Sequence, residues 1–438
     1  MNSWTDLAKE LALNKLNQRT APLLVDEDQA WTVEQLLALE LTPEPFWVAD
    51  SLQTILGSAS VAKQLAAILQ SWMRRKVPVL FSPFWSESQR HLNWKSLLSS
   101  FSSSAPHEEL ASMLFTSGST GAPKAIGHSF GNHLSAAQSS HEILPFAQGS
   151  TWLVSLPFFH IGGLQLVFRA LLNGGTLVSH AGRISEGIVH HRPSHISLVD
   201  RQLQDILQDE SATHAAKKAE VILVGGGPLF PTTAQAAQKH GLKFRVTYGS
   251  TETCAQVMTA RPDAPTELCC LLPNRELKIA EGGAVCIRGP QIAEAQWVHG
   301  KRESLLDEKG WFVSQDRGVL HADGRLEMLG RLDLQFISGG ENVQPETTES
   351  ALCSFPEVAF AVVVPVPDAK FGARPFAFLS LEDGQRMPET AEIRERLKSS
   401  VARHELPVGT ASMPKFSLKV ERRKLRRLAI SLYSTSNT

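Results

Sequence analysis

The chain has 438 residues, of which 42% are hydrophobic and 20% are charged, as in ordinary globular proteins. Its 43 basic and 44 acidic side chains give a formal net charge of −1, so overall charge gives no reason to expect nucleic acid or an anionic membrane as a partner. The chain is longer than the size at which a single hydrophobic core stops growing, so we expect one large domain and at least one smaller one.

The cysteines and the N-terminus favour the cytoplasm. Five cysteines without any CxxC spacing predict neither a disulfide framework nor a zinc site. No stretch approaches the roughly 18 apolar residues of a membrane span. Residues 1–20 read as an amphipathic helix with interspersed charges rather than as an unbroken apolar leader. A homo-oligomer is compatible with all of these features.

The first clear element in chain order is the apolar run "LASMLF" at 110–115, which predicts a buried strand. From there to about residue 250, short apolar runs alternate with helical patterns, which is typical of parallel α/β layers. The expected strands are 110–115, 151–159, 195–199, 221–227 and 244–249, and the expected helices are 133–144, 164–175, 201–208 and 232–241.

Antiparallel patterns follow, including a hairpin at 311–330 with an Asp-Gly turn, and a strand pair at 359–368 and 374–382. Helices are expected at 346–355 and 390–404. We therefore predict an α/β protein with two domains. Residues 1–330 form a large domain of layered, mostly parallel sheets and helices with an antiparallel β part, and residues 331–438 form a small α+β domain.

The stretch "TSGSTGAPK" at 116–124 is rich in hydroxyls and glycines and follows the first predicted strand. Glycines let backbone N–H groups approach an anion closely, and hydroxyls and a lysine donate further hydrogen bonds, so we expect a phosphate loop. A flexible linker would lack the preceding apolar strand. A P-loop NTPase would place its lysine directly after the last glycine, whereas Ala122 and Pro123 intervene here.

Three further segments accompany this loop: "YGSTET" at 248–253, "QDRG" at 315–318 with "GRLD" at 330–333, and "FSLKVER" at 416–422. Together the four resemble the adenylate-forming enzymes, the superfamily of acyl-CoA synthetases, luciferases and peptide-synthetase adenylation domains. The resemblance implies ATP, Mg²⁺ and CoA as ligands. It also implies a carboxylate that first becomes an acyl-adenylate and then a thioester, and a small domain that rotates between these two steps.

The resemblance also implies the site residues. At the nucleotide phosphates it implies Thr116, Ser117, Gly118, Ser119, Thr120, Gly121 and Lys124. Around the adenine, ribose and remaining phosphate it implies Gly225, Gly226, Gly227, Tyr248, Gly249, Thr251, Asp316 and Arg331. Glu252 is implied as the Mg²⁺ ligand, since one carboxylate with phosphate oxygens and waters is usual for that ion.

Four further positions follow from the same resemblance. Lys419 is implied as the catalytic lysine of adenylation, although Leu418 precedes it where the superfamily usually has glycine. His160 is implied beside the reacting carboxylate. Asp333 is implied as the hinge, and Gly339 and Gly340 as the lining of the pantetheine channel.

Within the superfamily, the stretches "WLVSLPFFHIGGLQLVFRALLNGG" and "GRLDLQFISGGENVQPE" resemble the o-succinylbenzoate–CoA ligases of menaquinone biosynthesis. That acid keeps a second carboxylate, so its pocket needs a fixed cation, for which Arg169 is the candidate, with Ser197 as a second contact. Another aryl- or fatty-acid–CoA ligase, a carrier-protein adenylation domain, or an adenylate-binding protein without turnover remain as alternatives.

Overall fold

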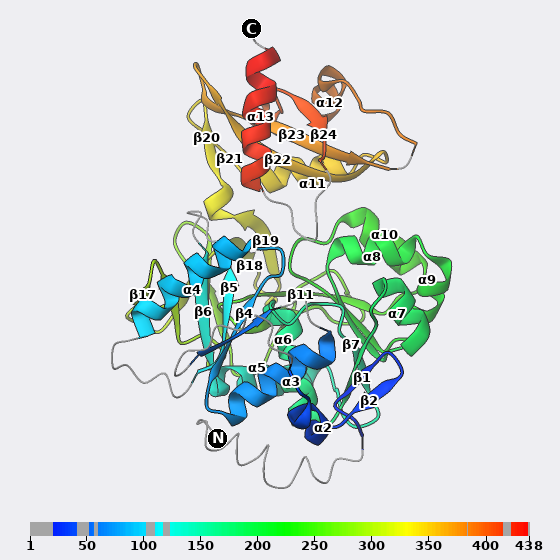
Figure 1. The fold of residues 1–438 in the computed structure, drawn as a ribbon. Coiled ribbons are helices and arrows are strands. Elements are labelled where there is room, and N and C mark those ends of the chain that lie inside the picture. Colours follow the sequence, from blue (N-terminus) through cyan, green and yellow to red (C-terminus); the bar gives the residue numbers. More distant parts are fainter. Residues whose placement is uncertain are drawn as a thin grey trace.

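The structure is a computed structural model that describes residues 21–41, 52–56, 60–101, 110–116, 123–382, 384–414 and 422–436. A large N-terminal domain of sheets and helices carries a small C-terminal domain, drawn from yellow to red in Figure 1. The predicted fold class is confirmed. Within the described residues, none of the helices combines the length and apolarity needed to cross a membrane.

The larger sheet has nine strands in the order β13-β12-β11-β10-β9-β7-β8-β1-β2. Their bounds are β1 (Leu24–Asp26), β2 (Gln29–Trp31), β7 (Thr151–Leu153), β8 (Thr176–Ser179), β9 (His195–Leu198), β10 (Val221–Val224), β11 (Phe244–Ser250), β12 (Ala255–Thr259) and β13 (Cys270–Leu271). Within this order, β11, β10, β9, β7, β8 and β1 run parallel to one another. Both edges are antiparallel, so the predicted parallel core is present.

The second sheet has six strands in the order β17-β16-β6-β5-β4-β3. Their bounds are β3 (Leu52–Leu56), β4 (Val77–Phe81), β5 (Leu110–Thr116), β6 (Lys124–Ser129), β16 (Ala295–Val298) and β17 (Lys301–Glu303). β5 and β6 are antiparallel neighbours in which Thr116 pairs with Lys124. The Gly/Ser segment therefore joins two strands, whereas a P-loop leads from a strand into a helix.

Three helices form the layer between the two sheets: α3 (Val61–Met73), α5 (Phe130–Ile143) and α6 (Ile161–Asn173). The ring of Trp72 on α3 lies 5.4 Å from that of Phe130 on α5 and 5.1 Å from that of Phe168 on α6. All three rings are fully buried. Aromatic side chains bury the most apolar area per residue, so this cluster holds the two sheets together.

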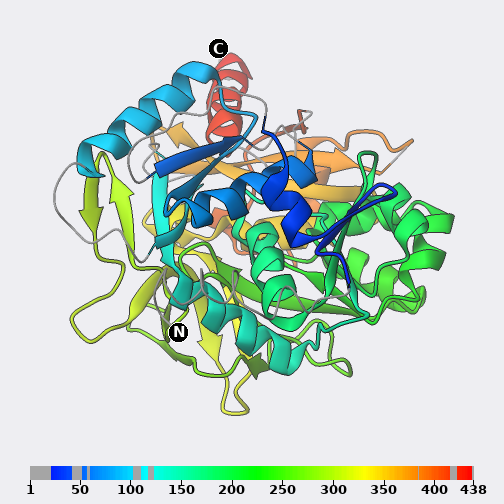
Figure 2. The same cartoon turned by 60° about the horizontal axis from the view of Figure 1, so that its bottom comes forward.

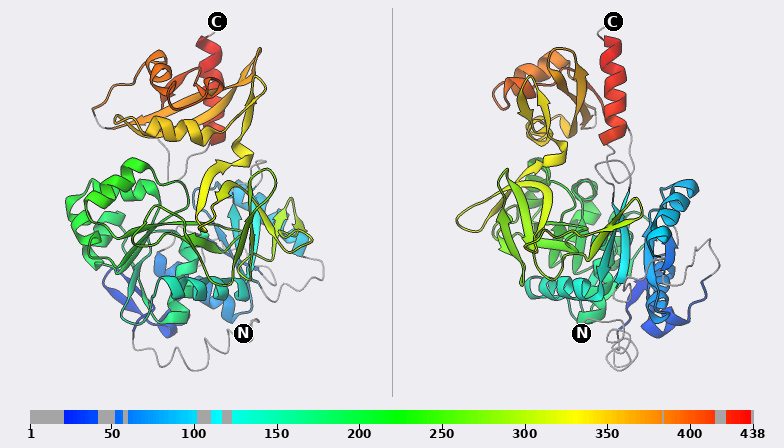
Figure 3. Two further views of the ribbon diagram at one scale, coloured as in Figure 1. Left: turned by 180° about the vertical axis from the view of Figure 1, so that it is seen from behind. Right: turned by 90° about the vertical axis from the view of Figure 1, so that its left-hand side faces the viewer.

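The remaining helices of the large domain cover its outer faces, apart from the short α2 (Val33–Ala38). Helix α4 (Glu87–Phe101) forms an outer layer beside β5 and β6, as the right panel of Figure 3 shows. The helices α7 (Ile184–His191), α8 (Asp200–Leu207), α9 (Glu210–Ala216) and α10 (Pro231–Lys239) pack on the nine-stranded sheet. Figure 2 shows them grouped at one side, with α5 and α6 nearer the middle.

An antiparallel sheet of four strands completes the large domain, in the order β14-β15-β18-β19. Its strands are β14 (Glu276–Ile279), β15 (Ala284–Arg288), β18 (Phe312–Leu320) and β19 (Leu326–Arg331). The predicted hairpin is confirmed: Gly324 has φ +83, and the carboxylate of Asp323 accepts from the N–H of Arg325 at 3.0 Å. This turn aligns Asp316 opposite Arg331 across β18 and β19.

The small domain contains the sheet β22 (Val358–Asp368), β23 (Gly372–Leu381) and β24 (Thr410–Ser412), with the helices α11 (Pro345–Cys353), α12 (Thr390–Leu397) and α13 (Arg422–Ser436). Side chains alternate across a strand. Ala361 and Val363 thus join the core under α11 and α12, while Val362 and Val364 join the core under α13. The β20–β21 hairpin (Phe336–Ser338 and Glu341–Val343) and the short helices η1 (Leu332–Leu334) and η2 (Arg403–Glu405) complete it.

Three sequence-based boundaries were wrong. The strand expected at 151–159 ends at Leu153, and a tight turn follows in which the N–H of Ser155 donates to the carbonyl oxygen of Leu153 at 2.9 Å. The helix expected at 390–404 ends at Leu397, before serines whose side chains compete for backbone hydrogen bonds. The strand expected at 221–227 ends at Val224, before the three glycines, because glycine weakens the interior of a strand.

Candidate active site

The segment Tyr248–Ala255 lies at the end of β11 in a conformation that needs glycine. Its regular pairing with β12 breaks between Tyr248 and Gly249. A Cβ on Gly249 would lie 1.5 Å from the carbonyl oxygen of Ala255, so a larger residue does not fit. Cys254 and Ala255 both have positive φ, at 52° and 78°. Such strained backbone gathers at functional sites.

Two contacts hold this segment in place. The Nε2 of His128 on β6 donates to the carbonyl oxygen of Thr251 at 2.7 Å. Burial lowers the pKa of His128 to about 4, so the ring is neutral at pH 7 and keeps the N–H on Nε2 for this bond. The carbonyl oxygen of Glu252 accepts from the N–H of Ala293 at 2.9 Å. The loop expected to carry the Mg²⁺ ligand is therefore held by β6 and by the segment between β15 and β16.

Tyr248, Asp316 and Arg331 meet, although they are far apart in the sequence. The Tyr248 hydroxyl donates to Oδ2 of Asp316 at 2.9 Å, and Nη1 of Arg331 donates to Oδ1 at 3.1 Å. The Asp316 side chain is 14% exposed, so it is not fully covered by these two partners. Burial, with the Asp316 charge second, raises the pKa of Tyr248, so the hydroxyl stays protonated. The three predicted nucleotide residues form one cluster.

Arg331 also forms an ion pair with Asp333, the predicted hinge residue. Its Nε and Nη2 donate to the two carboxylate oxygens of Asp333 at 2.8 and 3.0 Å. Its backbone N–H donates to Oε1 of Glu346 at 3.2 Å, and its carbonyl oxygen accepts from Nε2 of Gln344 at 3.0 Å. Gln344 and Glu346, at the start of α11, had not been predicted as part of the site. They clamp the backbone that enters the small domain.

The glycines 225–227 follow β10, where parallel strands end and ligands gather in such sheets. A Cβ on Gly225 would lie 2.7 Å from Cγ2 of Thr247, so this residue lets β10 and β11 approach closely. Gly226 has φ +78, and no atom lies within 4 Å of a Cβ built on Gly227. This part of the loop is thus an open backbone surface.

Several predicted residues lie outside the described part of the chain. Thr116 and Lys124 are described at the ends of β5 and β6, but the residues between them that were expected to bind phosphate are not. These are Ser117, Gly118, Ser119, Thr120 and Gly121. Lys419 also lies outside the described residues. Their roles stay predictions.

The two candidate acyl-substrate residues converge on Trp152. The guanidinium carbon of Arg169 lies 4.8 Å from the centre of the Trp152 ring, close enough for a cation–π contact. The indole Nε1 of the same Trp152 donates to Oγ of Ser197 at 3.1 Å. Arg169 is 4% exposed, so it is not a surface residue of α6. Burial lowers its pKa to about 10, and it remains charged at pH 7.

Only some of the hydrogen-bond donors of the Arg169 guanidinium have partners among the described residues. Its Nη2 donates to Oε1 of Gln256 at 2.6 Å, and the hydroxyl of Ser140 donates to the same oxygen at 2.9 Å. Among the described residues, its Nε has no hydrogen-bond partner. Leaving a buried charged donor unpaired is costly, which favours an anionic ligand beside it. Gln256 was missed by the sequence analysis, and its only signal is its position four residues after Glu252.

His160, Gly339 and Gly340 are not brought to these clusters by any contact described. His160 is exposed at the start of α6, with its ring 4.6 Å from that of Phe159. Gly339 and Gly340 lie at the tip of the β20–β21 hairpin, where the N–H of Gly339 donates to the carbonyl oxygen of Phe371 at 2.9 Å. Figure 1 shows this hairpin on the upper left of the small domain, away from the large domain.

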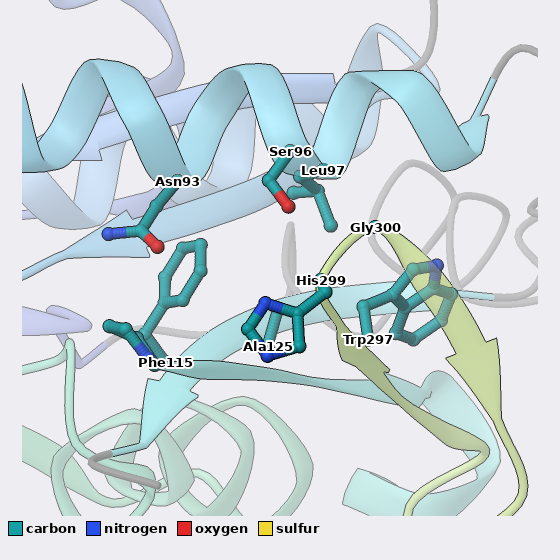
Figure 4. Close-up of a pocket in the computed structure, with 9 residues that line it drawn as sticks. Asn93, Ser96, Leu97, Phe115, Ala125, Trp297, His299 and Gly300 are labelled. Carbon is teal, nitrogen blue, oxygen red and sulfur yellow. The ribbon is translucent and has the colours of Figure 1, made fainter. Parts of the chain in front are cut away.

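A separate pocket lies between α4 and the strands β5, β6, β16 and β17 (Figure 4). Its walls include Asn93, Phe115, Pro123, Trp297 and His299. None of the predicted site residues lines it, although Phe115 and Pro123 flank the ends of the Gly/Ser segment. The described residues that were predicted to carry the chemistry lie instead in the Tyr248–Asp316–Arg331 cluster and beside Trp152, at Arg169 and Ser197.

Comparisons with known proteins agree with the motifs. The family model "AMP-binding enzyme" matches residues 45–297, and the model "AMP-binding enzyme C-terminal domain" matches residues 347–419. The 2-succinylbenzoate–CoA ligase of Escherichia coli K12 is 34% identical over 70% of this chain and 65% of its own length. That of Salmonella typhimurium is 35% identical over 73% of this chain and 69% of its own length. The chain thus spans about two thirds of these relatives.

Solved structures share the fold over nearly the whole chain. Escherichia coli MenE with bound OSB-AMS has a TM-score of 0.81 at 24% identity, with 99% of both chains covered. Bacillus subtilis MenE in complex with the acyl-adenylate intermediate OSB-AMP has a TM-score of 0.79 at 25% identity, with 97% of this chain and 98% of that chain covered. With the two family matches and the nucleotide cluster, these findings show that the chain belongs to the AMP-binding enzyme family.

Proposed function

We propose that this protein is an ATP-dependent acid–CoA ligase that converts 2-succinylbenzoate, ATP and CoA into 2-succinylbenzoyl-CoA, AMP and pyrophosphate, as a step of menaquinone biosynthesis. The curated relatives carry this activity in their names. The observation that carries the proposal is the buried Arg169, fixed on Trp152 with an unpartnered Nε among the described residues. A cation so placed suits an acid that keeps a second carboxylate.

In the first step, a carboxylate oxygen of the acid bonds to the α-phosphorus of ATP, and the bond to pyrophosphate breaks. Negative charge crowds the reacting centre, so donors and cations must face it. We assign Lys124 with the hydroxyls of residues 116–120 to the leaving phosphates, and Lys419 to the oxygens of the reacting carboxylate and α-phosphate. We place His160 beside that carboxylate.

Asp316 would hold the ribose. An ionised carboxylate only accepts hydrogen bonds, and each oxygen can accept more than one, so Asp316 suits the two ribose hydroxyls. Tyr248 and Arg331 fix the carboxylate in orientation through the contacts at 2.9 and 3.1 Å. We propose that Tyr248 presents its ring to the adenine and that the backbone of Gly225–Gly227 passes the other face. Gly249 and Thr251 shape the loop around the phosphates.

Glu252 would hold Mg²⁺. The described residues contain no group of three or more His, Cys, Asp or Glu side chains able to bind a metal alone. This donor set fits Mg²⁺, which takes one or two carboxylates together with phosphate oxygens and waters. A structure of Bacillus subtilis MenE is in complex with ATP and magnesium ion. Bound beside Glu252, the ion would neutralise charge on the phosphates.

In the second step, the CoA thiol attacks the acyl carbon and AMP leaves with the former carboxylate oxygen. The thiol needs a path that the adenylation arrangement does not provide. We propose that the domain of residues 331–438 rotates against residues 1–330 about Asp333, and that Gly339 and Gly340 then line the pantetheine channel. Hinges of this kind absorb the change in φ and ψ at a few element ends.

The site of action we propose is the cytoplasm, where ATP and CoA are supplied and thiols stay reduced. All five cysteines of the chain are free. Small-molecule partners suffice for the proposed reaction. A homo-oligomer stays a hypothesis that size-exclusion chromatography with light scattering would test.

Pyrophosphate release tests the function. The purified protein is given ATP and Mg²⁺ with 2-succinylbenzoate, benzoate or octanoate, each with and without CoA. We expect selective release with 2-succinylbenzoate and CoA-dependent thioester formation. Release with only the simple acids would keep the chemistry and overturn the substrate. No release with any acid, despite measurable ATP binding, would favour an adenylate-binding protein without turnover.

A further inference from the structure

Phe230 belongs to the large domain by sequence but to the small domain by packing. It lies three residues after the glycines 225–227 and directly before α10. Its side chain is 6% exposed and joins the buried core of the small domain, together with Leu352, Cys353, Val363 and Leu379. Its ring lies 5.5 Å from that of Phe360 on β22, at 78°. One aromatic side chain thus crosses between the domains.

The backbone of Phe230 is fixed to the large domain. Its N–H donates to Oδ1 of Asp200, the first residue of α8, at 3.1 Å. The other oxygen of Asp200 accepts from Nε2 of Gln204 at 2.9 Å. The preceding residue, Leu229, packs on the core between the nine-stranded sheet and its outer helices. Two successive side chains therefore lie in the cores of two different domains.

The small domain has a defined orientation relative to the large domain. Figure 1 shows α13 with its first turn toward the large domain, and the β20–β21 hairpin turned away. Arg422 begins α13 and donates to both carboxylate oxygens of the buried Glu349, at 2.5 and 2.8 Å. Arg422 is three residues after Lys419. Because the hairpin that contains Gly339 and Gly340 is turned away from the large domain, this orientation does not suit the thioester step assigned to them, and we assign it to adenylation.

We propose that Phe230 is a positioning residue that holds the small domain in the adenylation orientation, and that its side chain must leave the small-domain core before the thioester is formed. The inference rests on the proposed function for its two steps. Because Phe230 continues the loop of Gly225–Gly227, a nucleotide on that loop contacts the same segment that docks the small domain.

The size of the effect follows from burial. Burying a phenylalanine side chain favours the docked orientation by about tenfold to a hundredfold over one that exposes it. Phe230→Ala should remove most of this preference. Phe230→Leu keeps apolar volume and should restore part of it.

The first readout is the pair of half-reactions. For Phe230→Ala we expect pyrophosphate release to fall about tenfold or more, while conversion of supplied 2-succinylbenzoyl-adenylate and CoA to thioester is unchanged or faster. Phe376→Ala is the matched control, because Phe376 is 4% exposed in the opposite core of the small domain, under α13. That variant should slow both half-reactions alike or neither. Equal losses in Phe230→Ala would overturn the inference.

The second readout does not depend on activity. Cys353 is 0% exposed in the same cluster as Phe230, so its reaction with a maleimide, located by peptide mass spectrometry, reports undocking. We expect faster labelling of Cys353 in Phe230→Ala, partial reversal in Phe230→Leu, and no change at the buried Cys254 and Cys286. Unchanged labelling of Cys353 would contradict the inference. If no acid gave pyrophosphate, the proposed function would fail while this labelling still decided the role of Phe230.

Discussion

At the scale of single residues, Asp316 has two fixed partners and a side chain that is still 14% exposed. Tyr248 and Arg331 each engage one of its oxygens, so the carboxylate is oriented before any ligand arrives. Such preorganisation lowers the cost of binding. Asp316, in the segment "QDRG", is therefore held in a fixed orientation by residues from two other strands.

Replacing Asp316 by Ala should weaken ATP binding by about tenfold to a hundredfold, since hydrogen bonds to a charged group contribute about 1.5–3 kcal/mol. Calorimetric titration with ATP measures this change. Asp323→Ala is the control, because Asp323 lies in the exposed hairpin turn of the same sheet. Equal affinities in Asp316→Ala and Asp323→Ala would rule out the ribose assignment.

Lys419 gives the second residue-scale prediction. Lys419→Ala should slow adenylation by about 10²–10³-fold, the loss of one donor to charge that develops in the transition state. Thioester formation from supplied acyl-adenylate should change little. Lys424→Ala is the control, since it removes a nearby charge from α13. An unchanged adenylation rate in Lys419→Ala would show that another group does this work.

The residues that sequence motifs predicted and those they missed differ in a physical way. Tyr248, Asp316 and Arg331 each sit in a short motif, and the structure brings them into one cluster. Gln256, Gln344 and Phe230 act through contacts across the fold, at 2.6 Å to Arg169, at 3.0 Å to Arg331 and in the core of the other domain. No local pattern marks such partners, because the contact depends on the placement of two distant segments.

At the scale of elements, the start of α8 carries a carboxyl whose ionisation costs stability. Burial raises the pKa of Asp200 from 3.8 to about 6. In the unfolded chain the same carboxyl ionises near its ordinary value. The folded state therefore loses stability relative to the unfolded state as pH rises from about 4 through about 6.

Asp200→Asn should remove this cost and keep an acceptor for the N–H of Phe230. Relative to the wild type, the variant should be equally stable near pH 4 and more stable at pH 8, by about 1–3 kcal/mol. Urea unfolding at both pH values measures the difference. A gap between variant and wild type that stayed constant with pH would show that Asp200 ionises normally in the folded protein.

The segment that joins the domains gives another element-scale prediction. Proline fixes φ near −65° and removes the N–H, so Asp333→Pro should impair the two half-reactions unequally, by about tenfold or more in their ratio. Asp333→Ala is the control, because it removes the pair with Arg331 but leaves the backbone free. Measuring pyrophosphate release and thioester formation separately gives the ratio. The same loss in both steps would argue against a hinge here.

Element types were largely predictable, and their ends were not. Alternating apolar runs located β5, β9, β10 and β11, and helical spacing located α5 and α6. Those patterns reflect one buried face or a fully buried run, which sequence alone displays. The end of β7 coincides instead with a tight turn between Leu153 and Ser155, which the continuous apolar run at 151–159 does not reveal. The sequence of α4 shows little periodic separation of apolar from polar residues, so it did not predict a helix.

At the scale of the whole molecule, the sequence indicated two domains of different size, but not the strand orders. The nine-stranded sheet places β1 beside β8, more than a hundred residues later, and β2 pairs with β1 at the edge. The six-stranded sheet brings β16 beside β6. Tyr248 of β11 donates to Asp316 of β18, which accepts in turn from Arg331 of β19, so strands far apart in the sequence supply one cluster.

An oxygen-18 labelling experiment tests the proposed two-step reaction most directly. The protein is given 2-succinylbenzoate labelled with oxygen-18 in its carboxylates, together with ATP, Mg²⁺ and CoA, and the products are analysed by mass spectrometry. If an acyl-adenylate forms and the thiol then attacks its acyl carbon, AMP carries one labelled oxygen and the thioester accumulates with it. Unlabelled AMP, or label in orthophosphate with ADP as the nucleotide product, would contradict the account.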